Sequence, residues 1–210
     1  MIRVSTKRYG QFCGLARALD LVGDRWSLLI VRELLVGPAR YSDLRAGLPG
    51  IATNLLARRL RELEGHGVLE RRLSPDAVVY ALTDFGHGLR EPVEALVRWS
   101  TPLMAAGRGD DAFHASWLLV ALRALLRRPA SGGPACVEIE VDGEVITIHA
   151  ATDELSVTLG PSAAAQARLA SDAATVLGLA AGHVRVADAI RTARHFEGAP
   201  EALETIFGRA

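Results

Sequence analysis

The stretch from Leu48 to Arg72, LPGIATNLLARRLRELEGHGVLERR, constrains the fold more than any other part of the sequence. Pro49-Gly50 marks a tight turn, and Gly65 and Gly67 mark a stop. Between them, four apolar residues recur at helical spacing: Leu55, Leu56, Leu60 and Leu63. The sequence therefore predicts an amphipathic helix that is fed by a turn and ends at glycines.

The opposite face of this helix carries short or basic side chains, which are Thr53, Asn54, Ala57, Arg58 and Arg61. A helix that enters the major groove of DNA needs an apolar face for its own core and polar side chains for base edges and phosphates. An ordinary solvated helix has a similar composition, because arginine is a good helix former. The pattern alone leaves both interpretations open.

The residues before this helix predict a mostly helical N-terminal half. We expect helices over residues 12–21, 25–37 and 41–48, separated by turn-forming residues. Asp24 is the expected N-cap of the second of these helices, because aspartate readily accepts hydrogen bonds from the first turn.

The residues after it predict a hairpin. Residues 68–73 and 77–82 read as two short strands joined by the turn-forming trio Ser74-Pro75-Asp76. Thr83 is expected to cap one long helix that is kinked at Pro92. Helix, turn, helix and hairpin is the order of a winged helix-turn-helix, which reads DNA with its second helix.

This interpretation names candidate DNA contacts. Those expected at base edges are Thr53, Asn54 and Arg58, and those expected at phosphates are Arg40, Arg45, Arg59, Arg61, Arg71 and Arg72. The distribution of charge along the chain also favours DNA contact by the first half. Residues 1–105 hold 15 basic and 11 acidic side chains, whereas residues 106–210 hold 9 and 13. The imbalance favours contact with nucleic acid by the first half.

Short motifs across the first 100 residues add a family resemblance. They are Cys13, Ala18-Leu19-Asp20, Gly23 to Trp26, Gly37-Pro38, Arg40-Tyr41, Leu48 to Ile51, Arg59 to Leu63, Tyr80, Leu82-Thr83 and Gly86. This set resembles the HxlR-type winged-helix transcriptional regulators, which are related to the MarR-type regulators. The resemblance implies a bacterial homodimer that binds double-stranded operator DNA, with the terminal helices of this domain forming the dimer.

Three features depart from the family pattern. Gly14 stands where the family usually has proline, and Ala52 stands where it usually has serine. The N-cap of the reading helix is therefore missing or supplied by Thr53. The wing turn, Ser74 to Ala77, is short and lacks the usual double proline and a further arginine, so its DNA contacts are less secure than those of the helix.

The second half predicts a small α+β domain. Asp142-Gly143 between residues 136–141 and 144–150 is a strong hairpin signal, and residues 154–160 read as a third strand of an antiparallel sheet. We expect helices over residues 117–128, 162–169, 172–181, 186–193 and 201–207, and loops at 104–113 and 127–135. The fold class is thus α+β, with a winged helix-turn-helix domain at 1–105 and a second domain at 112–210.

The end of the chain carries a second resemblance. Its residues Asp172, Leu177, Leu179, Gly182, Ala187, Ala189-Ile190, Gly198 and Leu203 resemble the end of sterol-carrier-protein-like domains, which enclose an apolar cavity. The candidate lining residues are Trp117, Leu118, Leu122, Leu125, Leu177, Ile190, Phe196 and Phe207. Two alternatives remain open: these residues are only core, or the domain is a spacer without a ligand.

The sequence offers no sign of an enzyme. Its six histidines lack metal-ligand spacing, and neither a phosphate-binding glycine loop nor a nucleophile elbow is present. Glu138, Glu140 and Glu144 are expected to form a solvated sheet face. We therefore expect no catalysis, cofactor or metal.

Cys13 has two interpretations. It falls at the position where some HxlR-type regulators sense oxidants or electrophiles, and Arg17 one turn later could lower its pKa. A small apolar residue packed at the dimer interface is the simpler interpretation.

The expected setting is the cytoplasm of a bacterium. Two cysteines form no disulfide framework, and the chain shows neither an 18-residue apolar run nor a signal peptide. We expect a homodimeric regulator, acting as a repressor on an inverted-repeat operator and responding to an apolar small molecule, without a membrane partner. The alternative is an apolar-ligand carrier whose winged helix serves dimerisation.

Overall fold

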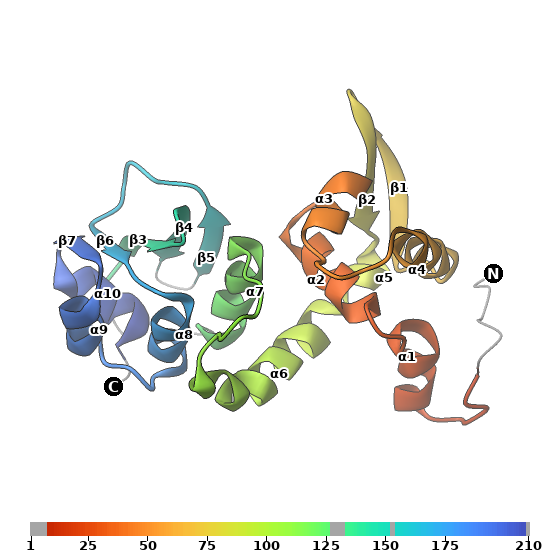
Figure 1. The fold of residues 1–210 in the computed structure, drawn as a ribbon, viewed down its shortest axis with the longest axis horizontal. Helices are drawn as coiled ribbons and strands as arrows, with labels where there is room; N and C mark the ends of the chain where they lie inside the picture. Colours follow the sequence, from red (N-terminus) through yellow and green to blue (C-terminus); the bar gives the residue numbers. More distant parts are fainter. Residues whose placement is uncertain (1–7, 127–132, 152–153, 209–210) are drawn as a thin grey trace. The chain divides into compact units, whose positions relative to one another are not determined.

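The computed structural model describes residues 8–126, 133–151 and 154–208. The chain divides into two compact units, Met1–Val93 and Glu94–Ala210, and each has its own buried apolar core. Figure 1 shows the helices and strands of both units in chain order. In the described residues, no helix combines the length and apolarity needed to cross a bilayer.

The first unit has the predicted order of elements. They are α1 (Gly14–Val22), α2 (Ser27–Val36), α3 (Tyr41–Ala46), α4 (Thr53–Gly65), β1 (Leu69–Ser74), β2 (Ala77–Leu82) and α5 (Asp84–His87). The amphipathic pattern of α4 is confirmed, because Leu56, Leu60 and Leu63 are fully buried. Burying each of these leucines contributes roughly 1.5–3 kcal/mol, so the apolar face fixes which side of α4 remains exposed.

The hairpin of the first unit is also as predicted. Strands β1 and β2 pair antiparallel from Leu69 opposite Leu82 to Ser74 opposite Ala77. Ala39 adds an isolated bridge to β2, with backbone hydrogen bonds in both directions to Tyr80. The hairpin is thereby tied to the segment between α2 and α3.

Two predictions about helix ends in this unit are wrong. Asp24 does not cap α2: Trp26 occupies the N-cap position, and the Asp24 carboxylate pairs with Arg59 instead. Thr83 does act as an N-cap, but the helix that it caps ends at His87. The chain turns at Gly88 and then re-enters a helix.

That helix is α6 (Arg90–Ser100), which runs across the division between the units and continues as the 3₁₀ helix η1 (Thr101–Ala106). Pro92 does not kink it. It lies in the first turn of α6, where a missing backbone N–H leaves no intrahelical bond unmade.

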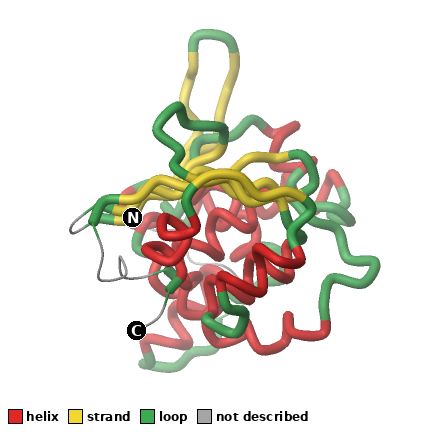
Figure 2. Tube along the Cα trace, turned by 90° about the vertical axis from the view of Figure 1, so that its left-hand side faces the viewer, coloured by secondary structure: helices red, strands yellow, loops and turns green. Residues whose placement is uncertain are grey.

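The second unit contains the remaining elements. They are α7 (Ala115–Leu125), β3 (Ala135–Val141), β4 (Glu144–Ala150), β5 (Leu155–Leu159), β6 (Ala167–Ala170), α8 (Ala173–Ala181), α9 (Val186–Thr192), β7 (His195–Gly198) and α10 (Pro200–Phe207). The five strands form one sheet in the order β5-β4-β3-β6-β7. Figure 2 shows helices packed on one side of this sheet, and the contacts of α7 with β4 and β5 and of α10 with β3 agree.

The prediction of an antiparallel sheet is wrong in one respect. Residues 162–169 were expected to be helical, but the chain turns there and then forms β6, which pairs parallel to β3. Ala167 and Leu169 are buried whereas Arg168 is half-exposed, which is the alternation of a strand. The sheet is therefore mixed, with β7 as a further strand that the sequence did not indicate. The loop predicted at 127–135 falls mostly outside the described residues.

Candidate functional site

The turn before α4 is held by two neighbouring elements. Gly50 adopts a positive φ of 86°, which favours glycine, and a Cβ at this position would lie 3.9 Å from the ring of Trp26. The hydroxyl of Tyr41, in α3, donates a hydrogen bond of 2.8 Å to the carbonyl of Thr53. Ala52 is the N-cap of α4 and makes no side-chain hydrogen bond to the first turn. The hydrogen bond from Tyr41 therefore helps to fix the start of α4.

The exposed face of α4 presents Thr53, Asn54, Arg58 and Arg61. Among the described residues, no ion pair or hydrogen bond engages the guanidinium groups of Arg58 and Arg61. Both are therefore available to an external anion or base edge. They lie opposite the buried leucines, as the sequence predicts.

Arg59 differs from its neighbour Arg58. Its side chain is only 12% exposed, and its guanidinium pairs with Asp24 and, at 2.5 Å, with Glu62. These contacts join α4 to the loop before α2. In the free chain these pairs help to position α4, and the phosphate contact expected for Arg59 from the sequence would require them to open.

The two arginines of the wing are exposed but paired. Arg71 pairs with Glu64 at 2.9 Å, and Arg72 pairs with Glu70 at 2.6 Å. The hydrogen bond to Glu64 raises the pKa of Arg71, so this group stays charged. Exposed pairs of this kind are worth about 0–1 kcal/mol, so a phosphate can replace the carboxylate at little cost.

The tip of the wing is apolar, which the sequence analysis missed. Leu73 is 90% exposed and faces Val78 across the strands, and Val78 is exposed as well. Leu69 is the only buried position of β1, so the rest of the strand, including Leu73, lies in solvent. The last two candidates, Arg40 at the N-cap of α3 and Arg45 in its last turn, are both exposed.

Cys13 occupies the N-cap position of α1 and is exposed. Backbone hydrogen bonds from Ala16 and Leu15 lower the pKa of its thiol. Thus the helix N-terminus, and not the predicted Arg17, favours the thiolate. Arg17 instead lies 3.8 Å from the buried carboxylate of Asp20.

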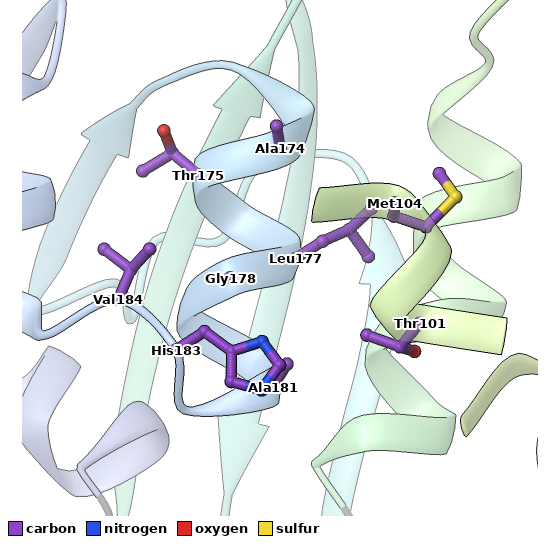
Figure 3. Close-up of a pocket in the computed structure, with 9 residues that line it drawn as sticks. All are labelled: Thr101, Met104, Ala174, Thr175, Leu177, Gly178, Ala181, His183 and Val184. Carbon is purple, nitrogen blue, oxygen red and sulfur yellow. The ribbon is translucent and has the colours of Figure 1, made fainter. Parts of the chain in front are cut away.

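Two neighbouring hollows lie among the described residues of the second unit. The larger, of about 320 Å³, lies between η1 and α8 and is lined by Thr101, Met104, Ala174, Thr175, Leu177, Gly178, Ala181, His183 and Val184. Figure 3 shows Leu177 pointing from α8 toward η1. The smaller, of about 140 Å³, shares Met104, Ala174 and Leu177 and is lined further by Gly107, Arg108, Ala112, Phe113, Trp117, Leu118, Ala121 and Ala173. We call them the η1–α8 hollow and the α7–α8 hollow.

The predicted ligand residues divide between these hollows and the core. Trp117, Leu118 and Leu177 line the α7–α8 hollow, and Leu177 also lines the other. The rest line neither: Leu122, Leu125, Ile190, Phe196 and Phe207. Leu122 and Phe207 are buried in the core.

The outer face of the sheet corrects the prediction for its glutamates. Glu138 is only 6% exposed, pairs with Arg168 at 3.1 Å and accepts a 2.7 Å hydrogen bond from the backbone N–H of Ser162. The loop that follows β5 thus covers this face, and of the three glutamates only Glu144 is fully exposed. Nearby, Sγ of Cys136 lies 3.3 Å from Nε2 of His149.

This cysteine–histidine pair does not resemble an activated nucleophile. Cys136 is buried, and burial raises the pKa of its thiol. Within the described ranges, no group of three or more His, Cys, Asp or Glu side chains could hold a metal ion.

Known proteins that resemble this chain match its N-terminal half. The family model described as HxlR-like helix-turn-helix matches residues 21–107. The uncharacterized HTH-type transcriptional regulator YvaP of Bacillus subtilis is 39% identical over 88 residues, which are 40% of this chain and 82% of that protein. The HTH-type transcriptional regulator YodB of the same organism is 33% identical over 93 residues, which are 43% of this chain and 83% of that protein.

A solved structure gives a similar match. The reduced form of YodB is 32% identical, with a TM-score of 0.40, and the match covers 46% of this chain and 99% of that one. The family model and YvaP match the same part of the chain, and this part spans most of the length of YvaP. The chain belongs to the HxlR-like helix-turn-helix family.

Proposed function

We propose that this protein is a homodimeric transcriptional regulator that represses its target by binding operator DNA. The observation that carries the proposal is the exposed face of α4, where Arg58 and Arg61 have no ion-pair partner in the described residues and lie beside Thr53 and Asn54. Exposed arginines on a helix face without a carboxylate partner are available to phosphates and base edges, whereas Arg59 is paired. The unpaired arginines favour DNA binding over the alternative of an apolar-ligand carrier.

The roles of the side chains follow from their positions. Thr53 and Asn54 lie in the first turn of α4 and Arg58 lies in the second, which suits contacts with base edges in the major groove. Phosphate contacts come from Arg61 of α4 itself and from the arginines of neighbouring elements, which are Arg40, Arg45, Arg71 and Arg72. Arg59 is reassigned to the support of α4.

A second copy of the chain is the proposed partner of two apolar surfaces. Phe12, Leu15 and Leu19 are exposed at α1, and Leu96 and Trp99 are exposed on α6. Large apolar side chains grouped on one element mark interaction surfaces. A two-fold dimer with reading helices one DNA turn apart predicts an inverted repeat with half-sites about 10 base pairs apart.

The second unit is proposed to hold an effector. Two open hollows with mainly apolar lining lie along η1, α7 and α8, and this apolar lining supports the sterol-carrier-like interpretation of residues 112–210. Residues 1–105 would then form the DNA-binding and dimerisation domain of a cytoplasmic regulator. An effector would change operator affinity only by its differential affinity for the free and bound states.

Footprinting on DNA upstream of the protein's own gene tests the proposal. We expect one protected inverted repeat and an affinity that falls steeply with salt, because phosphate contacts release counterions. The Asn54→Ala change should weaken specific binding by about 1–3 kcal/mol while non-specific binding changes less. Arg185→Ala, at an exposed arginine of the second unit, is the control. Equal affinity for all sequences would contradict operator recognition.

A further inference from the structure

The two hollows of the second unit share a wall that contains Met104 of η1. Ala174 and Leu177 of α8 complete the shared wall, so the two hollows adjoin each other at these three residues. The larger hollow, of about 320 Å³, lies at the lower end of the range for small-molecule sites, which is about 300–1,000 Å³, and the smaller one adds about 140 Å³ beside it. A compact molecule fits this space.

The lining defines the chemistry of such a molecule. The one guanidinium that lines either hollow belongs to Arg108, and it is paired with Asp142 at 2.7 Å. Both side chains of this pair are exposed, so it lies at the edge of an otherwise apolar lining, and this lining favours a neutral ligand over a charged one. The thioether of Met104 adapts to irregular shapes and contacts aromatic rings favourably. Phe113 and Trp117 add aromatic surface on the side of α7.

Apart from Arg108, the polar side chains that line the hollows all belong to the larger one, and they are Thr101, Thr175 and His183. His183 is exposed and its ring faces the hollow in Figure 3, so it can donate or accept a hydrogen bond. The hydroxyl of Thr101 already donates to the carbonyl of Val97 at 2.8 Å and keeps lone pairs free. One or two hydrogen-bonding groups on an otherwise apolar ligand match this lining.

We propose that the two hollows bind a compact, neutral aromatic molecule and that the bound molecule holds η1 in place. This inference deepens the proposed effector function and rests on it. The binding site is the space around Met104 that the two hollows share. The structural change on binding occurs in η1, which continues α6.

The connection to α6 is short. Ser100 and Thr101 both donate side-chain hydrogen bonds to the carbonyl of Val97, at 3.3 and 2.8 Å, so the start of η1 is tied to the last turn of α6. Leu96 and Trp99 of that helix belong to the proposed dimer surface. A ligand that fixes Thr101 and Met104 therefore acts on the element that sets the dimer.

Binding of prodan, a neutral naphthalene fluorophore with one carbonyl acceptor, to the full-length protein tests the site. We expect its emission to shift to the blue with saturable binding. Ala174→Phe should abolish this shift, because Ala174 is exposed at the second position of α8 and a phenyl ring there enters both hollows. Ala187→Phe, at the exposed second position of α9 and away from the hollows, is the matched control.

Hydrogen exchange tests the coupling. With prodan at ten times its Kd, amides of residues 101–107 should exchange about 11-fold more slowly if their opening requires ligand release. Unchanged prodan binding in Ala174→Phe would overturn the site, and binding without slower exchange in 101–107 would overturn the coupling. A protein that binds prodan as expected but no operator would refute the proposed function and leave the site standing.

Discussion

The neighbouring residues Arg58 and Arg59 provide a sharp test, because the structure gives them opposite roles. Arg58 is exposed and, among the described residues, has no ion-pair partner. Replacing it with alanine removes one contact with DNA and little from the fold. We expect specific operator binding to weaken by about 1–3 kcal/mol, with a smaller change in non-specific binding and an unchanged free energy of unfolding.

Arg59→Ala should act on stability. Its side chain is 12% exposed, whereas those of its partners Asp24 and Glu62 are 51% and 42% exposed, so solvent screens both pairs. Two screened pairs together contribute about 1 kcal/mol. With a urea m-value of about 1–3 kcal/mol per molar, the unfolding midpoint should fall by about 0.3–1 M.

Fluorescence of Trp26 follows this transition when Trp99 and Trp117 are replaced by phenylalanine, since the protein has three tryptophans. Fluorescence anisotropy with operator and random duplexes gives the two affinities. The reasoning is refuted if Arg59→Ala unfolds at the parent midpoint and weakens operator binding as much as Arg58→Ala. The ion pairs of Arg59 would then open on DNA, and Arg59 would be a contact residue.

Three further predictions concern other parts of the chain. Because backbone N–H groups of α1 lower the pKa of Cys13, iodoacetamide should label it with a pH midpoint below that of a free cysteine, and label must be lost in Cys13→Ser. Gly86→Ala should destabilise the first unit by about 3 kcal/mol or more in urea unfolding, since a Cβ would lie 1.9 Å from the carbonyl oxygen of Val68, and a parent midpoint would contradict this. Burial raises the pKa of Asp172, but hydrogen bonds from Thr175 lower it by more, so the pKa lies below its usual value. A carboxylate with a lowered pKa in the folded state stabilises the fold at every pH above its unfolded pKa, which is about 4. Asp172→Ala should therefore cost about 1 kcal/mol of unfolding free energy at pH 7, and this cost should disappear as the pH falls from about 4 through the lowered pKa.

The sequence predicted correctly those parts of the fold that are determined by residues a few positions apart in the chain. The hairpin at Asp142-Gly143 is one case: both residues adopt positive φ, 51° and 83°, as the dipeptide favours. The buried face of α4 is another, because a leucine spacing specifies it without any partner. Thr83 also caps a helix as predicted, through a bond to the N–H of Gly86 three residues later.

The parts that were missed depend on residues far away in sequence. Residues 162–169 are rich in alanine and favour a helix locally, but pairing with β3, about 30 residues earlier, makes a strand of 167–170. Glu138 was expected in solvent, and Arg168 and the loop at Ser162 bury it. Met104 was assigned to a linker, because only the packing of η1 on α8 shows that it lines the hollows.

The position of α4 shows why a reading helix is not specified by its own residues alone. Two contacts from other elements act on it, the hydroxyl of Tyr41 on the carbonyl of Thr53 and the carboxylate of Asp24 on Arg59. The ring of Trp26 also lies near the turn at Gly50, where a Cβ would be 3.9 Å from it. Trp26 holds a left-handed conformation with a φ of 82°, which is strained for an aromatic residue. Such strain persists where the surrounding structure requires it. Here the left-handed conformation of Trp26 places its ring near Gly50, in the turn that leads into α4.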